Sequence, residues 1–188
     1  MCVQIKSFFI YFKKMFYIIT VTMQFDPLED RIIMDCSNKS KDTQRLWLTR
    51  RLLNKLIPSL TDQLEVTSAN KISKELEQAF AQEKAEVKKI KTKSVVLKKD
   101  NPSWLVTSVK VEKSKFEFKL LFINENELET VEKDDNQKKA EFVLAISNLR
   151  QWLNALFKIY TKAEWDTNCF PNWIEDFNLK YEKKPFIN

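Results

Sequence analysis

One pattern constrains the fold of this chain more than any other: a short alternating stretch that continues directly into an apolar-faced helix. It occurs first at residues 45–64, where Leu46 and Leu48 alternate with Trp47 before a stripe of apolar residues at helical spacing. It returns at residues 140–160 in the same arrangement. Such a unit cannot cover its own apolar face, so we expect the two copies to pack together.

The segments that precede each unit alternate as half-buried strands do. They are residues 16–25 and 31–36 in the first half, and residues 104–113 and 115–124 in the second. We therefore predict an α+β fold of two pseudo-repeated antiparallel three-stranded meanders, each followed by a helix and packed as one domain, with an extra charged connecting helix. The expected segments are an N-terminal extension (1–14), the first strand-strand-strand-helix unit (15–66), the charged helix and basic linker (67–101), the second such unit (102–165) and a C-terminal aromatic tail (166–188).

Local signals predict the helix ends. Thr49 and Ser147 each precede a helical stripe, and a hydroxyl there can accept a hydrogen bond from a free backbone N–H. Pro58 lies inside the first helix and removes one donor, so we expect a kinked helix or two abutting ones. The charged helix at residues 68–91 has a thin apolar stripe, which consists of Ile72, Leu76, Ala79, Phe80, Val87 and Ile90. Glu and Lys around it predict a mostly solvated helix.

The first unit contains the run Leu-Trp-Leu-Thr-Arg-Arg-Leu at residues 46–52, followed by Leu56 and Pro58. The run Glu-Asp-Arg-Ile-Ile precedes it at residues 29–33. This combination resembles a signature of uncharacterised bacterial proteins. The similarity covers a small part of the chain and implies a bacterial cytoplasmic origin, but it carries over no functional residue.

Two absences restrict the chemistry. The chain has no glycine and no histidine among its 188 residues, although glycine makes up about 7% of an average protein. Phosphate-binding loops, dinucleotide fingerprints and nucleophile elbows need glycine where the backbone turns sharply or approaches phosphate. Histidine-based nucleophile activation and zinc sites with imidazole ligands are also excluded. Carboxylate, lysine, cysteine and tyrosine chemistry stays open, and we expect no cofactor.

The cysteines favour a reducing compartment. Cys2, Cys36 and Cys169 are widely spaced and form no CxxC motif, which favours free thiols in the cytoplasm over a disulfide framework or a metal site. No stretch reaches the roughly 18–20 apolar residues of a membrane span. Residues 1–14 differ in character from the rest, and three interpretations stay open: a start codon assigned too early, a membrane-surface anchor, or an extra ordered element.

Basic side chains define one candidate site, for nucleic acid or another anion. Arg50 and Arg51 lie in the first turn of the first helix, near Arg45, where the helix dipole disfavours a cation. Residues 84–99 hold seven lysines and one glutamate, a charge equal to the net +6 of the whole chain. The lysines of the candidate site are Lys88, Lys89, Lys91, Lys93, Lys98 and Lys99. The alternative is that the arginines form salt bridges with nearby acids, at Asp35 or in the turn at residues 26–30. The lysines would then be solvated, since they lack the interleaved aromatics of single-strand binders.

A second candidate site is aromatic. Trp165, Phe170, Trp173 and Phe177 crowd the C-terminal tail, and they form either an exposed patch for a protein partner or part of the core. The tail also carries four acids that general acid–base catalysis could use, although no pattern places them in a cleft. These acids are Glu164, Asp166, Glu175 and Asp176.

These observations favour a non-catalytic cytoplasmic interaction protein, an adaptor or assembly subunit that acts by protein–protein contact or self-association. Its mechanism would be apolar burial, with the lysine-rich segment facing an acidic surface of the partner. The alternative is a nucleic-acid-binding accessory protein that uses residues 84–99 together with Arg50 and Arg51.

Overall fold

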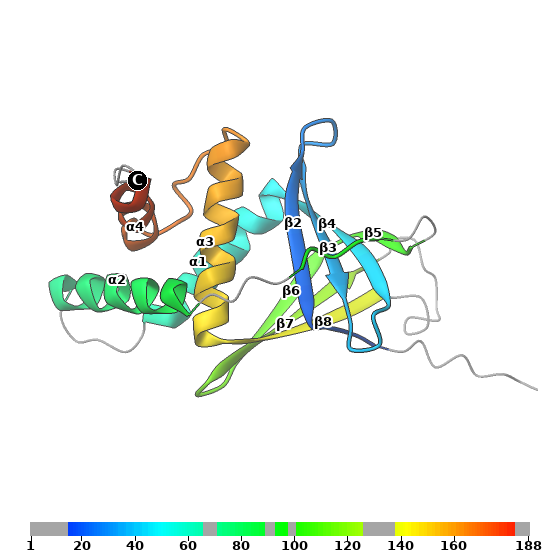
Figure 1. Ribbon diagram of the computed structural model, residues 1–188, viewed down its shortest axis with the longest axis horizontal. Coiled ribbons are helices and arrows are strands. Elements are labelled where there is room, and N and C mark those ends of the chain that lie inside the picture. The colour runs from blue at the N-terminus through cyan, green and yellow to red at the C-terminus, as the bar shows by residue number, and fades with distance from the viewer. Residues whose placement is uncertain (1–14, 66–70, 89–92, 98–100, 126–137, 183–188) are drawn as a thin grey trace, which may run out of the picture.

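The computed structural model describes residues 15–65, 71–88, 93–97, 101–125 and 138–182. Within these residues the chain forms four helices and eight strands in two four-stranded sheets (Figure 1), which confirms the predicted α+β class. The strands are β1 (Phe16–Ile18), β2 (Thr20–Asp26), β3 (Arg31–Ser37), β4 (Thr43–Thr49), β5 (Ser103–Leu105), β6 (Ser108–Lys113), β7 (Glu117–Asn124) and β8 (Lys138–Ala145). The helices are α1 (Arg50–Glu65), α2 (Lys71–Val87), α3 (Ile146–Lys162) and α4 (Asn172–Glu182).

Each sheet is built around one of the predicted antiparallel meanders. In one sheet β2 pairs with β3 and β3 with β4, and in the other β6 pairs with β7 and β7 with β8. The alternation in sequence sets the two faces of each sheet. In β4, for example, Leu46 and Leu48 are fully buried, whereas Trp47 between them is partly exposed.

Each sheet also contains a fourth strand, which the predicted three-stranded meanders lacked. The single strand expected at residues 16–25 divides at Ile19, and β1 pairs in parallel with β8 of the other half. The strand expected at residues 104–113 divides at Val106 and Thr107, and β5 pairs in parallel with β4. Both halves therefore have the same element order, and each contributes one short strand to the sheet of the other.

Backbone hydrogen bonds at the two dividing points explain how the chain changes sheets. The N–H of Ile19 donates to the carbonyl oxygen of Ser37 on β3 at 2.8 Å, directly after β1 has paired with β8. The N–H of Val106 donates to Trp47 on β4 at 3.0 Å, and the N–H of Thr107 to Ile123 on β7 at 2.9 Å. Because the backbone keeps a hydrogen-bond partner through each crossing, no buried donor is lost there.

The helices begin and end close to their predicted positions, but the predictions for Pro58 and for the cap of α3 need correction. The N–H of Leu52 donates to Thr49 Oγ1 at 3.2 Å, which confirms the cap of α1. The helix continues through Pro58 to Glu65 as a single element rather than as two abutting helices. At α3 the predicted Ser147 cap is wrong, because the helix begins at Ile146 after a residue that makes no side-chain cap bond.

One core joins the two halves. Buried side chains of both sheets and of the two repeated helices form a single cluster, and the hydroxyl of Tyr160 on α3 donates to Asn54 Oδ1 on α1 at 2.9 Å. Helix α3 lies between the sheets on one side and α2 and α4 on the other (Figure 1). In the described part of the chain, no helix has both the length and the apolar character needed to cross a membrane.

Candidate interaction surface

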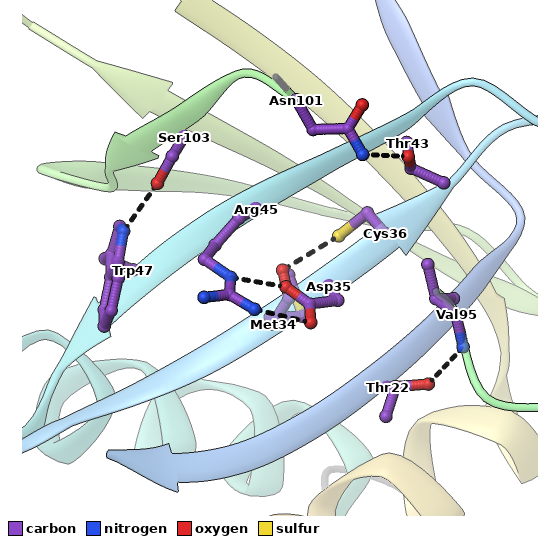
Figure 2. A network of polar contacts seen from close by, with 10 residues as sticks. All are labelled: Thr22, Met34, Asp35, Cys36, Thr43, Arg45, Trp47, Val95, Asn101 and Ser103. Carbon is purple, nitrogen blue, oxygen red and sulfur yellow. Dashed lines mark hydrogen bonds and ion pairs between the residues drawn. The ribbon is translucent and has the colours of Figure 1, made fainter. Parts of the chain in front are cut away.

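The first predicted basic residue, Arg45, is held inside a polar network on the outer face of β3, β4 and β5 (Figure 2). Its Nε and Nη2 donate to the two carboxylate oxygens of buried Asp35 at 2.7 and 3.0 Å. Its guanidinium lies 5.7 Å from the ring centroid of Trp47, whose Nε1 donates to Ser103 Oγ on β5 at 2.7 Å. The hydrogen bond to Asp35 raises the pKa of Arg45. Arg45 therefore balances an acid of its own sheet, as the salt-bridge alternative expected.

Arg50 also contacts an acid of the chain itself. Its Nη2 lies 3.9 Å from Asp30 Oδ2, and its guanidinium lies 5.5 Å from the ring centroid of Trp165. The indole Nε1 of Trp165 donates to the other carboxylate oxygen of Asp30 at 2.8 Å. Arg51, the next residue, is exposed. Two of the three arginines are thus engaged within the protein and do not converge on a common anion site.

The lysine-rich segment is described only in part. Lys88 and Lys93 are exposed, whereas Lys89, Lys91, Lys98 and Lys99 lie outside the described residues. The nucleic-acid hypothesis for this segment therefore stays a prediction.

The aromatic residues of the tail belong mainly to the core. Trp165, Phe170 and Trp173 are 5%, 7% and 3% exposed, so they do not form an exposed patch. Trp165 and Phe170 meet the ring of Tyr160 edge to face, with centroids 4.9 and 5.1 Å away, a favourable geometry for aromatic rings. Phe177 is half-buried. Of the two interpretations, packing in the core accounts for the three buried side chains.

An apolar surface instead lies on α2, whose orientation is the reverse of the usual amphipathic arrangement. The side of α2 that faces the protein presents Gln78, Gln82 and Ala85, all buried. The opposite side presents three large apolar side chains, and these are 58%, 63% and 80% exposed. We call this set the α2 stripe, and it consists of Leu76, Phe80 and Val87. Three of the four predicted stripe residues whose side chains the structure describes are therefore turned to solvent, while Ala79 packs against the core.

Polar contacts with α3 hold α2 in this orientation. The guanidinium of Arg150 donates to the backbone carbonyl of Gln78 at 3.4 Å and to the side-chain oxygen of the same residue. In return, Gln82 Nε2 donates to the carbonyl oxygen of Arg150 at 3.3 Å. One helical turn further, Gln151 Nε2 donates to the carbonyl oxygen of Ala85 at 2.6 Å. Gln78 Oε1 and Gln82 Nε2 supply the side-chain amides of this layer, which accounts for the burial of the polar side of α2.

Arg150 is the central group of this polar layer. It is 5% exposed, and its guanidinium lies 4.9 Å from the ring centroid of Trp173 on α4. Burial lowers the pKa of Arg150 to about 10, while the negative charge of Glu65 acts in the opposite direction. Glu65 also accepts from Trp173 Nε1 at 2.8 Å and lies 3.4 Å from Lys74 Nζ on α2. The cation is thus kept buried by amide oxygens, an aromatic face and a nearby acid.

This layer is incompletely satisfied. Gln82 Oε1 is buried and has no hydrogen-bond partner among the described residues. A buried polar atom without a partner costs about 1–3 kcal/mol. Docking of α2 is therefore specific in its geometry but weaker than apolar packing of the same area would be.

Hollows on the surface are modest in size. One of about 340 Å³ is lined by Glu164 and Glu175, so two of the four tail acids lie beside the same hollow. Another, of about 450 Å³, lies between β2 and α3. No group of three or more Cys, Asp or Glu side chains is gathered as metal ligands would be within the described residues.

Comparisons with protein-family models, curated proteins and solved structures find no match for this chain. The function is therefore inferred from the geometry of the described residues alone.

Proposed function

We propose that this chain is a non-catalytic interaction protein, an adaptor or assembly subunit, and that the α2 stripe is its contact surface. The observation that supports the proposal is the reversed orientation of α2. An amphipathic helix that only completes a fold buries its apolar side, whereas α2 is bound to α3 through Gln78 and Gln82. Its apolar side is left to be covered by another molecule.

Spacing and size suit such a contact. The residues of the α2 stripe lie at i, i+4 and i+11, hence on one side of the helix. Full burial of a Leu, Val or Phe side chain contributes about 1.5–3 kcal/mol. Partners that recognise a helix through residues at this spacing usually do so with an apolar groove or with a second helix.

Charged side chains beside the stripe are acidic at one end of α2 and basic at the other. Exposed Glu75 and Glu77 lie toward the N-terminal end of α2, and exposed Lys84 and Lys88 lie at its C-terminal end. A partner with charges in the opposite order would be favoured in one orientation. Such rim charges affect the association rate and the specificity more than the affinity.

A mutational binding assay tests the proposal. Proteins captured by the wild-type chain are identified and purified, and their affinity is compared with that for Leu76→Ser/Phe80→Ser. Loss of two anchors is expected to weaken binding at least ~100-fold, with an unchanged melting temperature because both side chains are exposed. Phe116→Ser is the matched control, since Phe116 is 72% exposed on the turn between β6 and β7. Equal affinities for all three proteins would refute the proposed surface.

The proposal includes a reducing, cytoplasmic environment. Cys36 and Cys169 are both free thiols, and Cys36 is buried. Nucleic-acid binding by the basic segment is the alternative, and no contact among the described residues favours it. A salt titration with DNA and RNA distinguishes the two, because neutralised phosphates make the affinity fall steeply between low and physiological salt.

A further inference from the structure

A groove separate from the α2 stripe runs between the edge of one sheet and α3. Its volume is about 450 Å³, within the usual range of about 300–1,000 Å³ for ligand sites. Ile19 and Val143, which line it, are 63% and 43% exposed, high values for such apolar side chains. The apolar part of the lining consists chiefly of Ile19, Val21, Met23, Val143, Ala155 and Ile159.

Two strand edges border this groove. β2 is the end strand of its sheet. β1 covers the outer side of β8 only from Ala140 to Phe142, so no described strand pairs with that side at Val143 and Leu144. The gap exists because the chain leaves β1 for the other sheet at Ile19. An open strand edge beside apolar side chains is the structure that extended peptides recognise, through main-chain hydrogen bonds and alternate side chains.

The charge of the lining limits the ligand further. Lys158 is the single charged residue among the described residues that line the groove, and its polar neighbours Thr20, Asn148 and Gln151 are neutral. An acidic side chain can therefore pair with Lys158, while a basic one finds no carboxylate in the lining.

We propose that this groove binds a short extended peptide segment of another protein. The segment carries apolar side chains at every second residue, which match the alternate positions of Ile19, Val21 and Met23. Its main chain forms hydrogen bonds with the open strand edge, and an acidic residue pairs with Lys158. This proposal uses a different surface from the α2 stripe and does not rest on the proposed function.

The test measures the affinity of two panels of fluorescein-labelled nonapeptides by anisotropy. One panel has valine at alternate positions with serine and glutamate between them, and the other has the same composition with valine at helical spacing. We expect members of the alternating panel to bind and the helical panel not to bind. Ala155→Phe, which fills the groove, is expected to weaken binding at least ~10-fold. Val143→Glu repeats the groove test on β8 at an exposed position, in case Ala155→Phe does not fold.

The control is Leu76→Ser/Phe80→Ser, which is expected to bind the alternating peptides as the wild type does. Refutation of the peptide groove is therefore distinguishable from refutation of the α2 stripe as a contact surface. The inference is overturned if no alternating peptide binds at millimolar concentration, or if the helical panel binds equally well. It is also overturned if Val143→Glu leaves the affinity unchanged, or if laurate binds in the groove and the peptides do not.

Discussion

At the scale of single residues, Arg45 and Asp35 form a bidentate ion pair, with 2.7 Å between Nε and Oδ1. Asp35 is 7% exposed and receives two charged hydrogen bonds from Arg45. Arg45→Ala would leave this carboxylate buried and unpaired, at a cost of about 2–3 kcal/mol in the free energy of unfolding. Urea denaturation measures the change. Arg51→Ala, at an exposed position, is the control and is expected to change stability by less than about 0.5 kcal/mol. Equal effects of the two substitutions would contradict the structural role of Arg45.

Cys36 predicts a pH dependence of stability. Burial raises the pKa of its thiol, with the charge of Asp35 as a second cause. The folded state therefore keeps the proton at a pH where the unfolded thiol, with a pKa of about 8.5, has lost it. Stability is then fully present below the unfolded pKa and falls as the pH rises above it. Relative to Cys36→Ala, the wild type is expected to lose about 1–2 kcal/mol between pH 7 and pH 10. Parallel stability curves for the two proteins would refute this assignment.

The turns show how a chain without glycine forms left-handed positions. Asp30, Lys41 and Glu164 have φ values of 47°, 64° and 56°, a conformation that costs a residue with a side chain about 1–2 kcal/mol. Local side-chain bonds offset part of this cost, since Asn38 Oδ1 accepts from the N–H of Asp42 at 2.9 Å. The turn at residues 26–30 was expected from the sequence, whereas the left-handed conformations of Lys41 and Glu164 could not be predicted.

At the scale of the elements, α2 is the helix whose attachment is most sensitive to one residue. Arg150→Met removes the guanidinium bonds to Gln78 and the contact with Trp173. Amide hydrogen exchange in α2 is then expected to accelerate about ten-fold, as loss of one charged hydrogen bond implies, while amides of β7 keep their protection. Lys162→Met, at an exposed position in the last turn of α3, the helix that contains Arg150, should change exchange neither in α2 nor in β7. Equal acceleration in α2 and β7 would show that Arg150 supports the whole fold instead.

The sequence predicted that α2 is a helix but not which side it buries. Leu76, Phe80 and Val87 mark one side by hydrophobicity, and Gln78, Gln82 and Ala85 lie on the other at i, i+4 and i+7. The choice between them depends on Arg150, a buried cation that needs amide acceptors and that no local pattern distinguishes from a surface arginine. The exposure of the α2 stripe was therefore not predicted, although all of its residues were in the predicted apolar stripe.

At the scale of the whole molecule, the exchange of β1 and β5 makes the two halves interdependent. Each four-stranded sheet takes its fourth strand from the other half, so neither sheet is complete until both halves have folded. Period-two alternation predicted the strands themselves. The dividing points at Ile19 and at Val106–Thr107 carry no glycine or proline, and they are set by pairing with β3, β4 and β7. Such long-range pairing leaves no mark in the local sequence, which is why the meanders were predicted without their fourth strands.

Photo-crosslinking in cells tests the central claim, that α2 presents the contact surface of this protein, most directly. Benzoylphenylalanine replaces Phe80 in one variant and Phe116 in a second. Both phenylalanines are exposed, Phe80 on α2 and Phe116 on the turn between β6 and β7. We expect a discrete adduct of reproducible mass from position 80, lost when Leu76→Ser is added, and no such adduct from position 116. No adduct from position 80, or the same adducts from both positions, would contradict it.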